Sequence, residues 1–309
     1  RCALLIGSKS GRIPRRRQKL QRFTPLDFVI YVSILIFSLF CVLPFFLILI
    51  VSFTDEASIV KNGYSFFPET FSLKAYTMVF KNGGAIFQSY GISILITVVG
   101  TVLAVCITSM AAFTLANKSV QCRKGLSFFF FFTMIFNAGI VPWYMVCRTL
   151  GLVDNLASLI VPGLMFNAFN LFLVRNFMNG IPDSLLESAK LDGANDFVIF
   201  VKFYLPLSGA GLATIGLFTA LGYWNNWYNA MMYINKADLY PLQYLLYQML
   251  TSITGLRDAA SKAGLVVADM PDETFKMAMA VITTGPIILL YPFVQKYFVK
   301  GLTVGSVKG

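Results

Sequence analysis

Few residues in this chain of 309 have the types and spacing that chemistry requires. It contains no histidine, and its five cysteines are scattered with no Cys-x-x-Cys pair, which argues against a metal site or a disulfide framework. No nucleophile elbow is present, and no acidic pair lies within an apolar run where it could relay protons. The segment Gly7–Ser10 lacks the spacing of a phosphate-binding loop, so any nucleotide hydrolysis belongs to another chain. We therefore predict that the chain is not an enzyme and binds no cofactor or metal itself.

One polar stretch, residues 181–206, indicates two short helices joined by a turn. Ser184 and Glu187 have the spacing of a capping box, in which each side chain binds a backbone N–H at the start of a helix. Gly193 can end this helix in the left-handed conformation. The second helix has a candidate cap in Asn195 or Asp196, and helical spacing predicts an aromatic face formed by Phe197, Phe200, Val201 and Tyr204. Two stiff helices of this kind favour a docking surface for another protein over a simple connection.

The composition is that of an integral membrane protein. Hydrophobic residues make up 57% of the chain, charged residues only 13%, and the mean hydropathy is +0.71. Backbone polar groups in lipid must be satisfied within their own segment, so long apolar runs predict spanning helices. We predict an all-α protein with six of them, at residues 28–52, 86–115, 126–146, 156–174, 205–222 and 277–293. Pro44 should bend the first helix without ending it.

The distribution of charge predicts how these helices are oriented. Six spans put both termini on one side of the membrane, and that side holds 17 of the 25 Lys and Arg residues. Because basic loops remain in the cytoplasm, we predict that both termini and the polar stretch are cytoplasmic. The net charge of +11 then reflects topology and not binding to nucleic acid. The expected divisions are a basic N-terminal arm at 1–27, a membrane domain at 28–300 with an outer loop at 223–275, and a tail at 301–309.

Two patterns outside the polar stretch predict helix contacts. In the outer loop, apolar residues recur at helical spacing after Pro241, namely Leu242, Leu245, Leu246, Met249 and Leu250. The following residues, 251–273, are expected to form an exposed loop. On the fifth span, small residues form a face suited to close helix packing, at Gly209, Ala213, Gly216 and Ala220.

The polar stretch closely resembles the coupling-loop signature of ABC importer permeases, which reads Glu-Ala-Ala, then Asp-Gly-Ala, then Leu-Pro. The matching residues are Glu187, Ala189, Asp192, Gly193, Ala194, Leu205 and Pro206. Ser188 replaces an alanine of the signature, and Gly209-Ala210 stands where sugar importers often have a Lys-Pro pair. The run Tyr223–Trp227 and the ending Lys300–Gly309 extend the resemblance over nearly the whole chain. The chain is most similar to the MalG-type carbohydrate permeases, and among them to the LplC branch.

This resemblance implies the type I ABC importer (MetI-like) fold, an all-α integral membrane protein with six transmembrane helices and a cytoplasmic coupling helix. It implies import of oligosaccharides or related sugars across the inner, or cytoplasmic, membrane. The implied partners are a MalF-like second permease, two ATPase subunits that hold ATP and Mg, an extracytoplasmic sugar-binding protein and the lipid bilayer. Glu187, Asp192 and Gly193 are expected in a cleft of the ATPase, and the tail from Gly301 near the ATPase dimer interface. The alternative is a secondary transporter driven by an ion gradient, whose midplane ionisable groups these spans lack.

A substrate path for sugars would need hydrogen-bonding amides and aromatic faces. Candidates within or beside the spans are Asn137, Asn167, Asn170, Trp224, Asn225, Asn226, Trp227 and Tyr228. The asparagines can equally form interhelical hydrogen bonds, and the aromatic residues can anchor the chain at the membrane interface. Arg148 could favour an anionic sugar such as a uronate, or could simply anchor its helix near the headgroups.

Overall fold

The computed structural model describes residues 25–81, 83–262 and 272–288, and these are mostly helical. The isolated β-bridge found among them joins Thr54 to Phe71. The chain divides into two units, 1–46 and 47–309, and every contact discussed below lies within the second. Helix α1, Pro25–Ser52, includes the boundary between the units and does not end at Pro44, as predicted.

The other helices follow one another with short connections. Before the polar stretch they are α2 (Glu56–Asn62), α3 (Lys74–Phe80), α4 (Gly83–Ala116), α5 (Arg123–Ile135), α6 (Ile140–Thr149), α7 (Ala157–Ile160) and α8 (Ala168–Asn179). From there on they are α9 (Asp183–Leu191), α10 (Asp196–Ile199), a π-helical turn (Phe200–Tyr204), α11 (Leu205–Leu207), α12 (Gly209–Trp224), α13 (Trp227–Tyr233), a 3₁₀ turn (Ala237–Leu239) and α14 (Leu242–Lys262). A further helix occupies 273–288.

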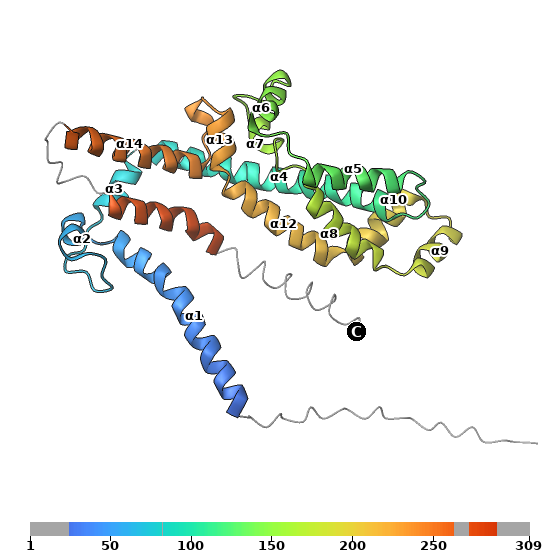
Figure 1. The fold of residues 1–309 in the computed structure, drawn as a ribbon, viewed down its shortest axis with the longest axis horizontal. Helices are drawn as coiled ribbons and strands as arrows, with labels where there is room; N and C mark the ends of the chain where they lie inside the picture. Colours follow the sequence, from blue (N-terminus) through green and yellow to red (C-terminus); the bar gives the residue numbers. More distant parts are fainter. Residues whose placement is uncertain (1–24, 82, 263–271, 289–309) are drawn as a thin grey trace, which may run out of the picture. The chain divides into compact units, whose positions relative to one another are not determined.

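Helix α4 is the long axis on which the second unit is built. Its 34 residues correspond to about 50 Å of helix, and α8 and α12 pack along it (Figure 1). One core lies where these three helices meet, and its fully buried members include Leu115, Leu171, Val174, Met178 and Ile215. A second core joins the start of α4 to α14 and helix 273–288, and includes Ile86, Trp224, Leu242, Leu246 and Phe275.

The described helices give between two and four candidate membrane spans. Helices α1 and α4 are each long and apolar enough to cross a bilayer. Two further spans require that a bent pair be counted as one: α5 with α6, which meet at 117°, and the segment Asp196–Leu207 with α12, which meet at 77°. The fold is therefore all-α and membrane-spanning, while the predicted six spans are not all present as continuous helices.

The predictions of single helices at 126–146 and 156–174 were wrong. The first is broken at 136–139, where Asn137 Oδ1 accepts the N–H of Gly139 at 2.8 Å and Gly139 has φ +88°. The second is divided into α7 and α8 by Pro162 and Gly163, the latter at φ +79°. Proline and a left-handed glycine both interrupt the helical hydrogen-bond ladder, and they outweighed the apolar character of these runs.

Helix α12 packs the ring of Tyr223 against Gly100 of α4. A Cβ atom at this position would overlap the ring of Tyr223, which is fully buried and donates its hydroxyl to the carbonyl of Ile160 at 2.7 Å. Farther along α12, a Cβ on Gly211 would come within 2.5 Å of the Phe177 ring. The predicted small-residue face of α12 is correct in part: a Cβ on Gly216 would lie 3.6 Å from Val105 of α4, but the buried residues of the helix are Gly211, Ile215, Thr219, Tyr223 and Trp224.

The predicted apolar helix of the outer loop is confirmed as α14, but it continues to Lys262, well into the segment expected to be a loop. The rest of that segment up to residue 271 lies outside the described residues. Helix 273–288 is tied to the long helices by two hydrogen bonds. Tyr90 donates to the carbonyl of Ile282 at 2.7 Å, and Trp224 donates to the carbonyl of Thr283 at 3.1 Å.

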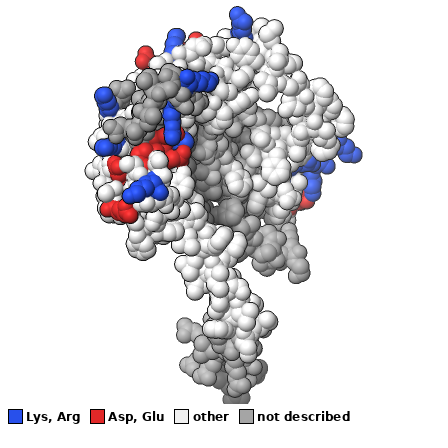
Figure 2. All heavy atoms as spheres, turned by 60° about the vertical axis from the view of Figure 1, so that its left-hand side comes forward, with Lys and Arg blue, Asp and Glu red and all other residues white. Residues whose placement is uncertain are grey.

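The start of helix 273–288 is held by a carboxylate far away in sequence. Glu56 accepts the backbone N–H groups of Glu273 at 3.0 Å and Thr274 at 2.9 Å, and also the Thr274 hydroxyl at 2.8 Å. Asp272 pairs with Arg257 and with Lys276, so acidic and basic side chains gather on this side of the molecule (Figure 2). A hydrogen bond from Tyr64 lowers the pKa of the Glu273 carboxyl. These contacts hold residues 56–64 and the last turns of α14 against the start of helix 273–288.

Replacing Glu56 by alanine should lower the free energy of unfolding by about 2 kcal/mol, because helix 273–288 loses a charged acceptor for its first N–H groups. The midpoint of thermal unfolding of the purified chain in detergent measures this. Glu69→Ala is the matched control, since Glu69 is exposed and, among the described residues, forms no hydrogen bond or ion pair with that helix. Equal midpoints for the two variants would contradict this role for Glu56.

Candidate functional site

Helix α9 begins one residue before the predicted capping box. Pro182, with φ −62° and ψ 132°, occupies the N-cap position, and no side chain caps the helix there. Ser184 is already inside the helix, where its backbone carbonyl accepts the hydroxyl of Ser188 at 2.9 Å. Glu187 therefore does not reach back to the helix start and remains exposed on the surface. The capping-box prediction was wrong because Pro182, which has no N–H to satisfy, is itself well suited to precede a helix.

The end of α9 confirms the predicted role of Gly193. Its φ is +83°, in the left-handed region, and its N–H donates to the carbonyl of Lys190 at 3.0 Å. The next N–H, of Ala194, donates to the carbonyl of Ala189 at 3.0 Å. This pair of bonds is the Schellman motif, which satisfies carbonyls that the helix end would otherwise leave without partners. The turn between the two short helices is consequently fixed by backbone hydrogen bonds.

Helix α10 is capped by Asn195, whose Oδ1 accepts the N–H of Val198 at 2.8 Å. Asp196 is the first helical residue and lies 3.8 Å from the ammonium of Lys190. The predicted aromatic face is correct only in part, because Phe197 and Val201 are exposed while Phe200 and Tyr204 pack inward. The π-helical turn at 200–204 adds a residue to the turn and so shifts which side chains face the core.

The two short helices are anchored firmly on the bundle. Tyr204 is 4% exposed, and its ring lies 4.9 Å from that of Phe113 on α4, in an edge-to-face arrangement. The Phe200 ring also contacts Phe113, at 5.2 Å. Ala189 is buried on the same core, and Asp183 at the start of α9 forms an ion pair with Lys118. The buried residues Ala189 and Tyr204 thus attach the two short helices to the core formed by α4, α8 and α12.

A second feature is an open groove of about 990 Å³ bounded by α5, α6, the start of α8 and α13. The break between α5 and α6 forms one wall, and α13 supplies Tyr228 and Asn229 from another. Its polar and large aromatic lining includes Thr133, Asn137, Trp143, Asn167, Tyr228 and Asn229. Amide groups beside exposed aromatic faces are suited to hydroxyl-rich ligands with apolar ring faces.

Comparisons with known proteins decide the family. The chain is 41% identical over 283 residues to the polygalacturonan/rhamnogalacturonan transport system permease protein YtcP of Bacillus subtilis, covering 92% of this chain and 98% of that protein. It is 40% identical over 270 residues to the protein LplC of the same organism, covering 87% and 90%. It also matches the crystal structure of a bacterial ABC transporter involved in the import of the acidic polysaccharide alginate, with a TM-score of 0.76 and 33% identity over 89% of this chain and 99% of that one. The chain belongs to the carbohydrate ABC importer permeases. No family model matches it.

As a carbohydrate ABC importer permease, the chain is an integral membrane component of an ATP-driven transport system and is not an enzyme. Importers of this kind also contain a partner permease, ATPase subunits and a binding protein. The alternative of a secondary transporter driven by an ion gradient is not favoured, since the relatives at 40% and 41% identity cover nearly the whole chain. The all-helical fold agrees with that of the alginate importer.

The seven residues that match the permease signature fall into two groups in the structure. Exposed members are Glu187, Asp192, Gly193 and Pro206. Ala189 is buried, while Ala194 and Leu205 are half-buried. Two apolar side chains are also exposed, Leu191 at 89% and Phe197 at 71%. Phe197 was predicted as part of the aromatic face, whereas Leu191 was missed, although its position on the opposite side of α9 from Ala189 was a signal for exposure.

Of the predicted substrate-path residues, Asn137, Asn167 and Tyr228 line the groove of the permease. Asn167 also caps α8 by accepting the N–H of Phe169 at 2.8 Å, and its neighbour Asn170 is not part of the lining. Four others serve packing or capping elsewhere: Trp224 in the second core, Asn225 bonded to Gln243, Asn226 as the cap of α13, and Trp227 stacked on Tyr247. Groove residues that the prediction missed include Trp143 and Asn229.

Proposed function

We propose that the chain forms, with a second permease, the pathway of an ATP-driven importer for acidic oligosaccharides. The observation that carries this proposal is the rigid, exposed pair α9 and α10 on a permease whose relatives serve sugar transport systems. The pair is fixed at its turn by the Schellman motif and at its base by the buried Tyr204 ring. Such an element transmits force because neither its turn nor its attachment can yield without losing hydrogen bonds or buried surface.

In this proposal the ATPase subunits, which hold ATP and Mg, bind the exposed side of α9 and α10. Glu187 and Asp192 supply polar contacts there, and Leu191 and Phe197 supply apolar side chains that a pocket on the partner can bury. The Gly193 turn sets the angle between the two helices. Closure of the ATPase pair on ATP then moves α9 and α10 together as one body.

A continuous stretch of helices connects the exposed side of α9 and α10 to the groove. Residues Asp196–Leu207 lead through the bend at Ser208 directly into α12, which ends at Trp224. Helix α13 follows after two residues and contributes Tyr228 and Asn229 to the groove lining. Movement of α9 and α10 would be passed on through α12 to α13. It would open the groove alternately to each side of the membrane.

The proposed orientation places α9, α10 and both termini in the cytoplasm and the segment 223–275 outside. It is supported by the excess of Lys and Arg on the predicted cytoplasmic side, 17 of 25. Helix 273–288 supplies the described part of the predicted sixth span. The arm, the tail and the end of that span lie outside the described residues. Outside the cell, an extracytoplasmic sugar-binding protein would deliver the substrate.

The groove supports a sugar as the substrate, and the names of the relatives support an acidic one. The groove offers amide and aromatic groups to a sugar, and no Lys or Arg is among its lining residues. One relative is named for polygalacturonan and rhamnogalacturonan transport, and the matching structure imports alginate, described as an acidic polysaccharide. We propose uronate-containing oligosaccharides, held in the groove by their ring faces and hydroxyl groups. Arg148, which lies outside the groove lining, is assigned an anchoring role in α6.

Replacing Trp143 by alanine should raise the KM for oligosaccharide uptake about tenfold while leaving the maximal rate nearly unchanged, because a stacking face is lost from the groove. Trp227→Ala is the matched control. This tryptophan is exposed to a similar degree, 37% against 48%, but is not part of the groove lining; it stacks on Tyr247 and meets Tyr228, a lining residue, edge to face. A larger KM effect at Trp227 than at Trp143 would place the sugar elsewhere.

The function as a whole is tested by reconstituting the chain with its partner permease, ATPase subunits and binding protein in proteoliposomes. Uptake is measured over a panel of neutral and uronate-containing oligosaccharides, with ATP, without ATP, and with an imposed proton or sodium gradient in place of ATP. We expect uptake only with ATP and only with the binding protein present. Uptake driven by the ion gradient alone would refute the proposal.

A further inference from the structure

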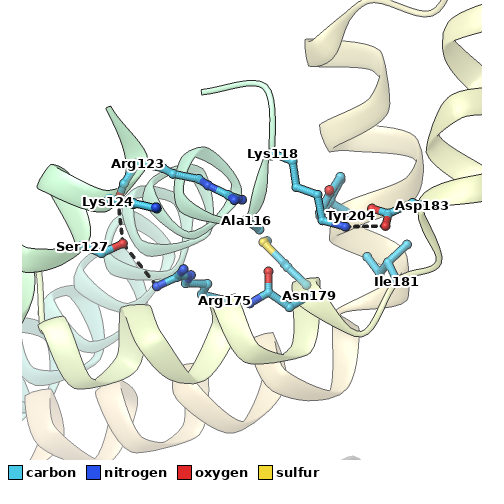
Figure 3. A pocket seen from close by; sticks show the side chains of 11 residues that line it. Ala116, Lys118, Arg123, Lys124, Ser127, Arg175, Asn179, Ile181, Asp183 and Tyr204 are labelled. Carbon is cyan, nitrogen blue, oxygen red and sulfur yellow. Dashed lines mark hydrogen bonds and ion pairs between the residues drawn. The ribbon is translucent and has the colours of Figure 1, made fainter. Parts of the chain in front are cut away.

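Next to the start of α9 lies an open cavity of about 470 Å³ with a strongly basic lining (Figure 3). Its walls come from the end of α4 and the loop after it, the start of α5, the end of α8 and the residues that lead into α9. The polar lining residues with most bearing on binding are Lys118, Arg123, Lys124, Arg175, Asn179 and Asp183. The cavity shares no lining residue with the proposed sugar groove.

The charges around this cavity are not balanced. Lys118 is paired with Asp183, the one acidic residue of the lining. Arg123, Lys124 and Arg175 form no ion pair with any carboxylate among the described residues. In Figure 3, Arg123 and Lys124 extend from α5 above the cavity, and Arg175 approaches from α8 below it. The lining therefore carries three cations that no carboxylate of the described residues neutralises, and these would attract an anion.

The guanidinium of Arg175 has a hydrogen-bond donor that is not used within the described residues. One of its terminal nitrogens donates to Ser127 Oγ at 3.2 Å, and Ser127 in turn donates to the carbonyl of Arg123 at 2.7 Å. The Nε atom of Arg175 is buried and has no hydrogen-bond partner within the described part of the chain. Arg175 lines the cavity, and a guanidinium is a planar set of donors whose geometry matches the oxygens of phosphate.

We propose that this cavity binds a phosphate group, carried by the headgroup of an anionic phospholipid or by a soluble phosphate compound. The lining supplies what a phosphate needs, namely two guanidinium groups and an ammonium from two helices and the side-chain amide of Asn179. Basic pockets between membrane helices on the cytoplasmic side are typical binding sites for anionic headgroups. The lipid source rests on the proposed cytoplasmic placement of this end of the bundle.

The surface beside the cavity favours the lipid as the source. Immediately after Ser127, helix α5 exposes Phe128 at 70%, and Phe132 one turn later at 50%, and neither lines the proposed sugar groove. An acyl chain can lie along these rings while its headgroup phosphate contacts Arg123 and Lys124 at the start of the same helix. The positions of charged and apolar groups on α5 thus match the order of headgroup and chain in a phospholipid.

A bound phosphate would also affect α9. It would place a second anion near Lys118, which holds Asp183, the first residue of that helix. The strength with which α9 is held to the bundle would then depend on occupancy of the cavity.

Native mass spectrometry of the full chain with its partner permease tests the site. Phosphatidylglycerol, phosphatidylethanolamine and inorganic phosphate are each titrated in the same detergent. We expect phosphatidylglycerol to bind about tenfold more tightly than phosphatidylethanolamine. Arg123→Gln, Lys124→Gln and Arg175→Gln should each weaken that binding about fivefold. Lys202→Gln, an exposed cation of the same region that does not line the cavity, is the control and should bind as the wild type does.

The three arms separate the sources. Binding of inorganic phosphate that depends on the same residues, without preference between the lipids, would support the site and assign it to a soluble phosphate compound. Lys124 is exposed, so Lys124→Gln keeps the test decisive if an arginine variant fails to fold. Equal binding of both lipids together with no phosphate binding, or wild-type binding by all three variants, would overturn the proposal. None of these measurements depends on sugar uptake, so their failure is distinct from failure of the transport function.

Discussion

Replacing Gly193 by proline is expected to reduce ATP-driven uptake by about tenfold or more while the chain remains folded and paired with its partner permease. Gly193 has φ +83°, whereas proline is fixed at about −65°. The variant also lacks the N–H that donates to the carbonyl of Lys190. Both effects disrupt the turn that sets the angle between α9 and α10, without touching the core of the bundle.

The matched variant for this test is Gly193→Asn, because asparagine is tolerated in the left-handed conformation at helix ends and keeps the N–H donor. We expect it to retain most of the uptake. Copurification of the partner permease and the thermal unfolding midpoint show whether Gly193→Pro is still folded. Uptake by Gly193→Pro equal to that of Gly193→Asn would contradict a mechanical role for this turn.

Replacing Gly100 by valine should destabilise the chain by about 3 kcal/mol, the upper end of what overpacking of a core usually costs. The new Cβ atom would overlap the Tyr223 ring, which has no exposed surface to move into and is held by its hydrogen bond to Ile160. Helices α4 and α12 would have to separate, and the core formed with α8 would lose contact. The yield of folded chain and its unfolding midpoint in detergent measure this.

Gly91→Val provides the control on the same helix, because a Cβ atom there would meet nothing within 4 Å. A second test removes the obstacle. Gly100→Val combined with Tyr223→Leu should be less destabilised than the sum of the two single changes, since the clash is absent from the double variant. Strict additivity would show that Gly100 matters for a reason other than its contact with Tyr223.

The sequence predicted those features that depend on hydrogen bonds within a few residues. Gly193 as a helix terminator and Asn195 as a cap each act on groups at most four positions away, and both are confirmed. The same local rules gave the wrong first residue for α9. Both Ser184 and Pro182 are acceptable at the N-cap position, and the structure has Pro182 there. Local signals identify the kind of structure better than its first residue.

The predicted spans failed where an apolar run contained a local breaker. The prediction relied on the apolar character of these runs and passed over two turn signals. These are Asn137 with Gly139, and Pro162 with Gly163. Contacts between distant segments were beyond prediction altogether. The bond from Glu56 to the start of helix 273–288 spans 217 residues, and nothing near either end indicates the other. The close contact between Gly100 and the Tyr223 ring likewise depends on how α4 and α12 pack.

The candidate site was predicted by its signature and refined by its geometry. The signature residues could be identified from the sequence, but not their division into exposed and buried members. The π-helical turn at 200–204 changed which aromatic residues face inward, and it leaves Phe197 exposed beside Leu191. Burial and exposure depend on the packing of α4 against this segment, so the apolar part of the docking surface became visible only in the fold.

Photocrosslinking from position 191 in the assembled importer tests whether α9 and α10 bind the ATPase, because Leu191 is the most exposed apolar residue of these two helices. A photoreactive amino acid is placed at residue 191 and, as the control, at Leu256, which is exposed near the end of α14. We expect a crosslink to the ATPase subunit from position 191, with a yield that changes when ATP is added, and none from position 256. A crosslink from position 191 only to the binding protein, or none to the ATPase, would contradict binding of the ATPase by α9 and α10.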